Sequence, residues 1–349
     1  MSVGSCLRRR SVIGVLVLAA ALAVTVSRCD PRAPGTAAPI AAALSLPDGT
    51  RRDDVRIPCG DTQCAAWLFR PAGAVRPPVV LMAHGFAGTR DVGLPFFAAH
   101  FAHAGMAALV FDYRHFGASG GLPRQLVDPW EQLDDWRAVL AWARGQADLD
   151  GSRVALWGSS LGAGHALTIA AGDPHLAAVV AQVPLIDTCL EGEATHYGAA
   201  WGVRLLFCAW GDFIGSAYGA SPLQIAAIAP AGGFGMIVDD GAHDAVARLT
   251  EPGTTYQNAV AARSAFLFDD YNPALHEAEI TAPVLLIASP RDRFAPFAAA
   301  QEYAAQASNV TLEVIDADHF EVYLPPARAA AADMATAFLI RHLGLQPAP

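Results

Sequence analysis

Residues 154–164 place a serine between two glycines, where an apolar run typical of a buried strand meets a predicted helix. Gly158, Ser160 and Gly162 form the G-x-S-x-G pattern of a sharp turn that exposes a nucleophilic serine. A side chain at either glycine would collide with the adjoining strand or helix. Because the chain has 31 glycines, the pattern alone arises easily by chance, and its position between strand and helix is what makes it specific. It predicts an α/β fold around a strained turn at Ser160.

The rest of the chain supports this fold class, because short apolar runs alternate with longer amphipathic stretches from residue 51 onward. We expect a mostly parallel eight-stranded sheet with helices on both faces. The predicted strands are Val55–Ile57, Ala65–Arg70, Pro78–Ala83, Ala107–Asp112, Val154–Gly158, Ala178–Gln182, Val284–Ser289 and Val310–Ile315. The predicted helices are Leu94–His103, Asp128–Gln146, Leu161–Ala171, Pro296–Ala307 and Ala327–Leu343.

The interval between the predicted strands Ala178–Gln182 and Val284–Ser289 breaks the alternation. It is far longer than the roughly 2 to 6 residues typical of loops in such folds, so we interpret it as an insertion. We assign residues 46–188 and 276–349 to the core and 189–275 to a helical cap or lid insertion. Most of its large apolar residues are expected to pack a small core, and a few to line a cavity over the carboxyl ends of the strands. These residues are Trp201, Leu205, Leu206, Phe207, Trp210, Phe213, Tyr218, Phe234, Met236, Phe266, Phe268 and Tyr271.

A serine nucleophile needs a base to take its proton and an acid to orient that base. In folds with this kind of turn the chain order is serine, acid, histidine. Asp292 and His319 each follow a predicted strand in that order, so both are expected at the same sheet edge as Ser160. Asp187 is the alternative acid. Asp316 and Asp318 are further alternative acids, but they are too close in sequence to His319 to face it easily. The alternative base is His342, which lies in the last turn of a predicted helix.

Acyl transfer also needs backbone donors for the oxyanion of its tetrahedral intermediate. The amide of Leu161, the residue after the nucleophile, is one candidate. The second is the amide of Phe86, which follows Gly85 in the loop after a predicted strand. We assign His84 a structural role. Tyr113, after the next strand, either fixes its loop or touches the pocket.

Composition narrows the chemistry further. All 23 basic residues are arginine, so a phosphate loop of the G-x-x-x-x-G-K-[ST] kind and a lysine Schiff base are both excluded. With 33 acidic residues the net charge is -10, which argues against nucleic-acid binding. Without lysine, proton transfer at Ser160 depends on His319, so activity should decline as that imidazole protonates at low pH. We expect neither a cofactor nor a metal.

Residues 1–45 are interpreted as a signal peptide or N-terminal anchor followed by a linker. Arg8 to Arg10 precede an uncharged run over 11–26 that is shorter than the roughly 20 residues of a spanning helix. The arginines partly match a twin-arginine signal, and Cys29 lacks the small preceding residue of a lipoprotein box. We therefore expect an exported protein, extracellular or in the cell envelope, that associates with membranes through this segment if at all.

An exported chain favours disulfides. Cys59 and Cys64 flank a turn between two predicted strands, and Cys189 and Cys208 form a second candidate pair. The alternative is four buried thiols. The spacing does not indicate zinc.

With His84-Gly85-Phe86, the strand-borne Asp112, the turn at Ser160, Asp292 and His319 in order, residues 50–345 resemble the alpha/beta-hydrolase superfamily. More narrowly the chain is similar to bacterial serine hydrolases related to dienelactone hydrolases and to prolyl and serine aminopeptidase-like hydrolases. The resemblance implies a Ser-His-Asp mechanism without a cofactor. Dienelactone hydrolases use a cysteine nucleophile, whereas this chain has Ser160.

The leading hypothesis is a carboxylic-ester hydrolase acting on a small, largely apolar substrate. The alternative is an exopeptidase, in which Glu191 and Glu193 would bind the substrate ammonium. A thioesterase or lactonase, and a non-catalytic binding protein of the same fold, rank below these two.

Overall fold

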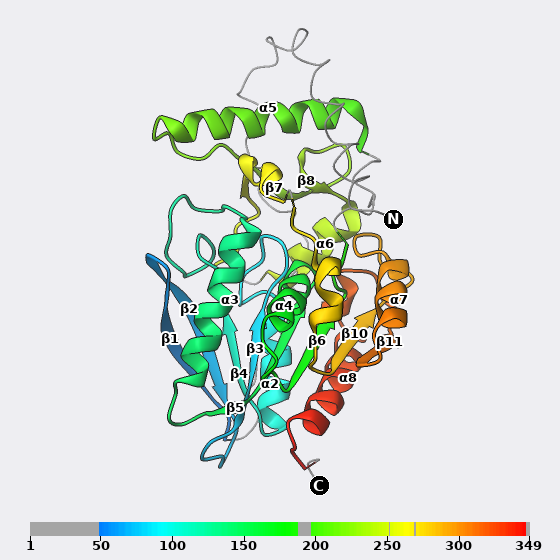
Figure 1. The fold of residues 1–349 in the computed structure, drawn as a ribbon. Coiled ribbons are helices and arrows are strands. Elements are labelled where there is room, and N and C mark those ends of the chain that lie inside the picture. Colours follow the sequence, from blue (N-terminus) through cyan, green and yellow to red (C-terminus); the bar gives the residue numbers. More distant parts are fainter. Residues whose placement is uncertain (1–48, 188–196, 251, 269, 347–349) are drawn as a thin grey trace.

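The computed structural model describes residues 49–187, 197–250, 252–268 and 270–346. Its centre is an eight-stranded sheet in the order β1-β2-β4-β3-β5-β6-β10-β11 (Figure 1). The strands from β4 to β11 in that order are parallel, while β1 and β2 form an antiparallel hairpin at one edge. The predicted mostly parallel sheet is therefore confirmed. The strands are β1 (Arg51–Cys59), β2 (Thr62–Arg70), β3 (Pro78–Ala83), β4 (Ala107–Phe111), β5 (Asp150–Ser159), β6 (Ala178–Gln182), β10 (Val284–Ala288) and β11 (Val310–Val314).

Helices cover both faces of this sheet, because successive side chains of each strand point to opposite faces. In β3, Val79 and Leu81 belong to one buried cluster, while Val80 and Met82 belong to the other. The first cluster contains residues of α3, α4 and α7, and the second contains residues of α2 and α8. These helices are α2 (Leu94–His103), α3 (Pro129–Arg144), α4 (Leu161–Ala171), α7 (Phe297–Gln306) and α8 (Ala327–His342).

The start of α3 shows why the predicted helices begin where they do. The Asp128 side chain accepts hydrogen bonds from the backbone N–H groups of Trp130 and Glu131, at 3.0 and 3.3 Å. Pro129 occupies the first turn, where its missing N–H costs nothing. Leu133 and Trp136 then turn one face toward the sheet, where both are fully buried.

The segment between β6 and β10 is not purely helical, which corrects the expectation for its interior. Figure 1 shows α5, β7 and β8 beyond one end of the large sheet. Besides its helices the segment contains a three-stranded sheet in the order β8-β7-β9. Asn258 extends this sheet by bonding both backbone groups of Ile228, at 2.9 and 2.7 Å. The elements are α5 (Gly198–Ala217), β7 (Gln224–Ala229), β8 (Gly235–Val238), α6 (Asp240–Leu249), β9 (Val260–Ala261), and the 3-10 helices η3 (Ala262–Phe266) and η4 (Pro273–Glu279).

The expectation that this segment buries most of its large apolar residues is wrong for one face of α5. Phe207, Trp210, Phe213 and Tyr218 are between 39% and 86% exposed. The helix instead buries Cys208, Ala209 and Asp212. These buried side chains are small or short, while the exposed aromatic residues lie on the outward face of the helix.

Cysteine pairing agrees with the prediction in the hairpin. Cys59 and Cys64 form a disulfide between β1 and β2, with their Cα atoms 5.7 Å apart. Cys208 is also disulfide-bonded, while Cys189, its expected partner, lies outside the described residues. The N-terminal signal or anchor lies outside them as well. None of the helices in the described ranges is long and apolar enough to cross a bilayer.

Candidate active site

The turn between β5 and α4 holds Ser160 in a strained conformation. Its φ of 56° and ψ of -122° are rarely adopted by residues other than glycine. A Cβ on Gly158 would overlap the carbonyl oxygen of Gly162, and a Cβ on Gly162 would overlap that of His84. The two glycines are therefore required by close backbone packing, as the sequence pattern predicts.

Three predicted side chains meet at this turn. His319 Nδ1–H donates to Asp292 Oδ2 at 2.7 Å, which leaves Nε2 to accept the Ser160 hydroxyl at 2.9 Å. Asp292 follows β10 and His319 follows β11, so neighbouring parallel strands deliver both. Asp292 Oδ1 also accepts the backbone N–H groups of Phe294 and Ala295, each at 2.8 Å. Both Asp292 and His319 are buried, which shields their interaction from water.

The alternative acids bond elsewhere. Asp187 accepts from Asn272 Nδ2 at 2.9 Å. Asp318 accepts the N–H groups of Phe320 and Glu321, within its own turn. Asp316 pairs with Arg291 on the surface at 3.2 Å. The alternative base, His342, lies in the last turn of α8, as expected, rather than at this edge of the sheet.

The predicted oxyanion donors, Phe86 and Leu161, both line the pocket beside Ser160. Leu161 is the first residue of α4, so its N–H has no acceptor within the helix. The loop carrying Phe86 reaches the turn because Gly85 has no side chain: a Cβ there would lie 2.9 Å from Ser160 Cβ. The assignment of these two amides as oxyanion donors stays a prediction.

His84 lines the cavity, and Tyr113 packs behind it. His84 Nδ1–H donates to the carbonyl oxygen of Gly85 at 2.9 Å, and burial lowers the pKa of His84 to about 4. This contact fits the structural role expected for His84. Tyr113 packs edge-on against His84, and its hydroxyl accepts from Trp136 Nε1 at 2.9 Å, so it does not line the pocket.

Two pairs of residues fix the loop that carries Phe86, and neither pairing is predicted from the sequence. Asp112, at the end of β4, accepts from the backbone and the guanidinium of Arg90, both at 2.7 Å. Burial raises the pKa of Asp112 to about 6, and Arg90 opposes that shift. Asp91 accepts from the N–H and hydroxyl of Thr255, at 2.6 and 2.8 Å, and so joins the loop to the segment between β6 and β10. Neither pair has a sequence signature, because each joins residues far apart in the chain.

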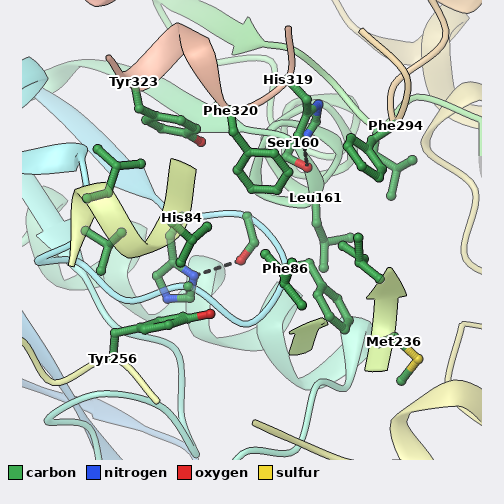
Figure 2. A pocket seen from close by; sticks show the side chains of 18 of the residues that line it. His84, Phe86, Ser160, Leu161, Met236, Tyr256, Phe294, His319, Phe320 and Tyr323 are labelled. Carbon is green, nitrogen blue, oxygen red and sulfur yellow. Dashed lines mark hydrogen bonds between the residues drawn. The ribbon is translucent and has the colours of Figure 1, made fainter. Parts of the chain in front are cut away.

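A cavity of about 440 Å³ opens above Ser160 (Figure 2). Its polar side chains besides Ser160 and His319 include Asp187, Tyr256 and Tyr323. Apolar side chains make up most of its wall, and of the residues proposed for it from sequence, Leu205, Met236 and Phe268 are present. The full apolar lining comprises Phe86, Val92, Leu94, Leu161, Leu185, Leu205, Ile228, Met236, Ile237, Val246, Leu249, Ala265, Phe268, Phe294, Pro296 and Phe320.

Potential metal ligands gather at one other place in the described ranges, where Cys59, Cys64 and Asp135 lie close together. The two sulfurs are joined in the disulfide, and Asp135 is paired with Arg114 at 2.8 Å. This group therefore offers no thiolate to a metal. Glu191 and Glu193, the predicted ammonium ligands, lie outside the described residues.

Comparison with known proteins gives a family match over most of the chain. A family model described as X-Pro dipeptidyl-peptidase (S15 family) matches residues 60–321. That span includes Ser160, Asp292 and His319.

Individual relatives agree with this match. The quorum-quenching protein AidA of Acinetobacter baumannii is 38% identical over 274 residues, covering 78% of this chain and 90% of the relative. The thiohydrolase aneE of Aspergillus aculeatus is 33% identical over 121 residues, covering 35% of this chain and 38% of the relative. The crystal structure of the alpha/beta hydrolase GrgF from Penicillium sp. sh18 superposes with a TM-score of 0.73 and 23% identity. It covers 84% of this chain and 100% of its own.

Proposed function

This chain belongs to the X-Pro dipeptidyl-peptidase (S15) family within the alpha/beta-hydrolase superfamily, and we propose that it hydrolyses carboxylic esters with Ser160 as nucleophile. One observation carries this proposal. The hydrogen bonds from Ser160 to His319 and from His319 to Asp292 form a continuous chain that opens on a largely apolar cavity. Membership of the superfamily supports a hydrolytic reaction, and the largely apolar cavity is the reason to propose uncharged esters as substrates.

Acylation begins when Ser160 Oγ attacks the ester carbonyl carbon and His319 Nε2 takes its proton. Asp292 stabilises the imidazolium through the bond from Nδ1 to Oδ2, and the two backbone hydrogen bonds to Oδ1 hold the carboxylate in that orientation. The carbonyl oxygen becomes an oxyanion, which the N–H groups of Phe86 and Leu161 would stabilise. His319 then gives the proton to the leaving alcohol as the carbon–oxygen bond breaks.

Deacylation repeats these steps with water. His319 removes a proton from a water molecule, the resulting hydroxide attacks the acyl carbon, and Ser160 leaves with the proton returned by His319. The products are a carboxylic acid and a regenerated serine. No cofactor enters either half of this mechanism.

The cavity wall supports an apolar acyl or alcohol group. Leu205, Met236 and Phe268 of the segment between β6 and β10 line the cavity together with Phe86 and Phe294 of the core. Each methylene of a substrate buried among them gains roughly 0.8 kcal/mol. We propose on the same basis that residues 189–275 act as a cap over the site.

A second candidate function is the exopeptidase activity named in the family's description. Asp187 is the observation that favours it, because this carboxylate lines the cavity without bonding to His319. A substrate ammonium would find an anion there. The rest of the wall is mainly apolar, which supports an uncharged ester over a charged peptide terminus.

We also propose that the protein is exported. The Cys59–Cys64 disulfide supports this, because such bonds persist mainly in oxidising compartments. Measuring the mature N-terminus of the protein from its native host tests the proposal. A chain that retains residues 1–45 in the cytoplasm would contradict it.

The substrate class is tested with a panel offered to the purified protein. Nitrophenyl esters from acetyl to dodecanoyl are compared with an octanoyl thioester, a lactone and an Ala-Pro naphthylamide. We expect the esters to give the highest kcat/KM, with an optimum at intermediate chain length. Ser160→Ala should lower kcat by roughly 10⁴-fold or more. Ser152→Ala, which changes an exposed serine, serves as the matched control.

Different outcomes separate the candidates. Preference for the Ala-Pro substrate, lost in Asp187→Asn, would replace the ester proposal with the peptidase. Preference for the thioester or the lactone would assign the chain to those classes. Equal ester turnover by the wild type and Ser160→Ala would exclude the mechanism altogether.

A further inference from the structure

Two side-chain hydrogen bonds join the segment after β11 to the end of β5 and the turn that follows it. The first is the 2.9 Å bond between His319 and Ser160 described above. The second lies beside it, where the hydroxyl of Tyr323 donates to Ser159 Oγ at 2.5 Å. Tyr323 belongs to the 3-10 helix η5 (Glu321–Tyr323), which directly follows the turn holding His319. Ser159 is the residue before the nucleophile.

Packing fixes the ring of Tyr323 in place. Gly93, at φ 77°, lies against it so closely that a Cβ there would be 2.9 Å from Tyr323 Cδ1. Phe97 meets the ring edge-on, with the centroids 6.3 Å apart. Burial raises the pKa of Tyr323 to about 12, so the hydroxyl remains a proton donor at neutral pH. In Figure 2, Tyr323, Phe320 and His319 lie along one side of the pocket.

The other hydrogen bonds of this segment shape it without attaching it to the turn. Asp318 accepts the N–H groups of Phe320 and Glu321, and the Glu321 carboxylate accepts the N–H of Asp318. The Glu321 carboxylate also pairs with Arg291, whose side chain is 51% exposed. A surface pair of this kind restrains a loop weakly. The buried bond between Tyr323 and Ser159 is therefore placed to resist displacement of His319 from Ser160.

We propose that Tyr323 is a positioning residue, which through Ser159 holds His319 Nε2 at hydrogen-bond distance from the Ser160 nucleophile. The inference rests on the proposed serine-hydrolase function. Its physical basis is that proton transfer from Ser160 requires a close, aligned contact. A displacement of about 1 Å can reduce the rate by as much as roughly 10²-fold. The hydrogen bond between Tyr323 and Ser159 acts by fixing the position of His319, and Tyr323 makes no bond to the substrate's reacting atoms.

A double-mutant cycle with Tyr323→Phe, Ser159→Ala and the double variant tests this role. All three variants remove the hydrogen bond between Tyr323 and Ser159, so each is expected to lower kcat by a similar factor, roughly tenfold. Ser159→Ala also removes the long 3.4 Å bond from Gln182 Nε2 to Ser159 Oγ, which makes Tyr323→Phe the more selective of the single variants. KM on the preferred ester should stay within about twofold, since the phenylalanine ring still lines the cavity. The rate at which a fluorophosphonate labels Ser160 should fall by the same factor, because that reaction also needs His319 as base.

Tyr113→Phe is the matched control. It also removes a buried tyrosine hydroxyl with a hydrogen-bond partner, but that partner is Trp136 and the residue lies away from the cavity wall. We expect it to lower the thermal unfolding midpoint while kcat and the labelling rate stay at the wild-type values. The comparison separates loss of positioning from general loss of stability.

Unchanged kcat in Tyr323→Phe, a change confined to KM, or independent losses that multiply in the double variant would each overturn the inference. The two readouts also separate it from the proposed ester function. If the wild type is labelled at Ser160 but hydrolyses none of the esters, the ester proposal fails, and the labelling rates still decide the role of Tyr323. If the wild type is not labelled at Ser160, both fail.

Discussion

His319 donates a 2.7 Å hydrogen bond from Nδ1 to Asp292, at the carboxyl edge of two neighbouring parallel strands. The strand on the other side of β10 leads to Asp187, which bonds to Asn272 instead. Of the two candidate acids that follow neighbouring strands, Asp292 is the one that bonds to His319, because β10 lies next to β11 and β6 does not.

Substituting Asp292 and Asp187 one at a time should show, from kcat, which carboxylate supports His319. Asp292→Asn removes the charge that orients and stabilises the imidazolium, so we expect kcat to fall by about 10⁴-fold. Asp187→Asn should retain most of the wild-type kcat on esters. Steady-state kinetics of both variants on the preferred ester provide the measurement. The reverse order of effects would assign the acid to Asp187.

The glycines of the turn should tolerate no side chain. Gly162→Ala places a methyl group against the backbone of His84, so we expect it to lower the free energy of unfolding by about 1–3 kcal/mol and to lower kcat. Gly202→Ala is the matched control, because a Cβ there has open space within α5. It should be neutral or stabilise by up to about 1 kcal/mol. Urea unfolding compares them, and equal effects of the two substitutions would show that the turn is less tightly packed than described.

Breaking the buried ion pair of Asp112 and Arg90 should lower the free energy of unfolding far more than breaking a surface ion pair. Asp112→Ala leaves the Arg90 guanidinium buried without its partner, so we expect a loss of about 3–5 kcal/mol in unfolding free energy. Asp134→Ala removes an exposed pair with Arg137 and should cost less than about 1 kcal/mol. Urea midpoints of the two variants distinguish these cases. A small cost at Asp112 would mean that water reaches Arg90.

Buried histidine should make stability depend on pH. Burial, together with the neighbouring His84, lowers the pKa of His165 to about 3, whereas the unfolded chain titrates near 6.5. Below that value the unfolded state binds a proton that the folded state excludes, so this contribution to stability falls as the pH drops from about 7 to about 5. His165→Gln removes this contribution, while His84, whose pKa burial lowers to about 4, keeps its own in every variant.

The comparison of variants isolates His165 from other titrating groups. Burial raises the pKa values of Asp112 and Asp135 to about 6, which opposes the trend, but both groups are retained in every variant. His165→Gln should therefore show a smaller loss of unfolding free energy between the two pH values than the wild type. His175→Gln, at an exposed position, should match the wild type. Equal pH dependence in all three proteins would contradict the account.

Much of the core could be predicted because its signals are local. Apolar runs mark the buried strands, and the order Ser160, Asp292, His319 brings the three side chains to one edge once the strands are parallel. The position of Gly85 beside the turn follows from the same pattern. For these residues the local sequence and the tertiary structure agree.

The rest depends on contacts between distant residues. The run Ile225–Ala229 of small and branched residues is compatible with strand or helix, and only its pairing with β8 and β9 decides. The aromatic residues on the outward face of α5 are exposed, although their residue type alone predicts burial. Tyr323 and Asp91 act through partners, Ser159 and Thr255, that no spacing in the sequence singles out.

The central claim is that Ser160 is a nucleophile activated by His319 and Asp292. The most direct measurement incubates the wild type and Ser160→Ala with a fluorophosphonate, followed by intact mass and peptide mapping. We predict a single covalent adduct on Ser160 in the wild type and none in Ser160→Ala. An unmodified wild type, or an adduct of equal yield in Ser160→Ala, would contradict the claim.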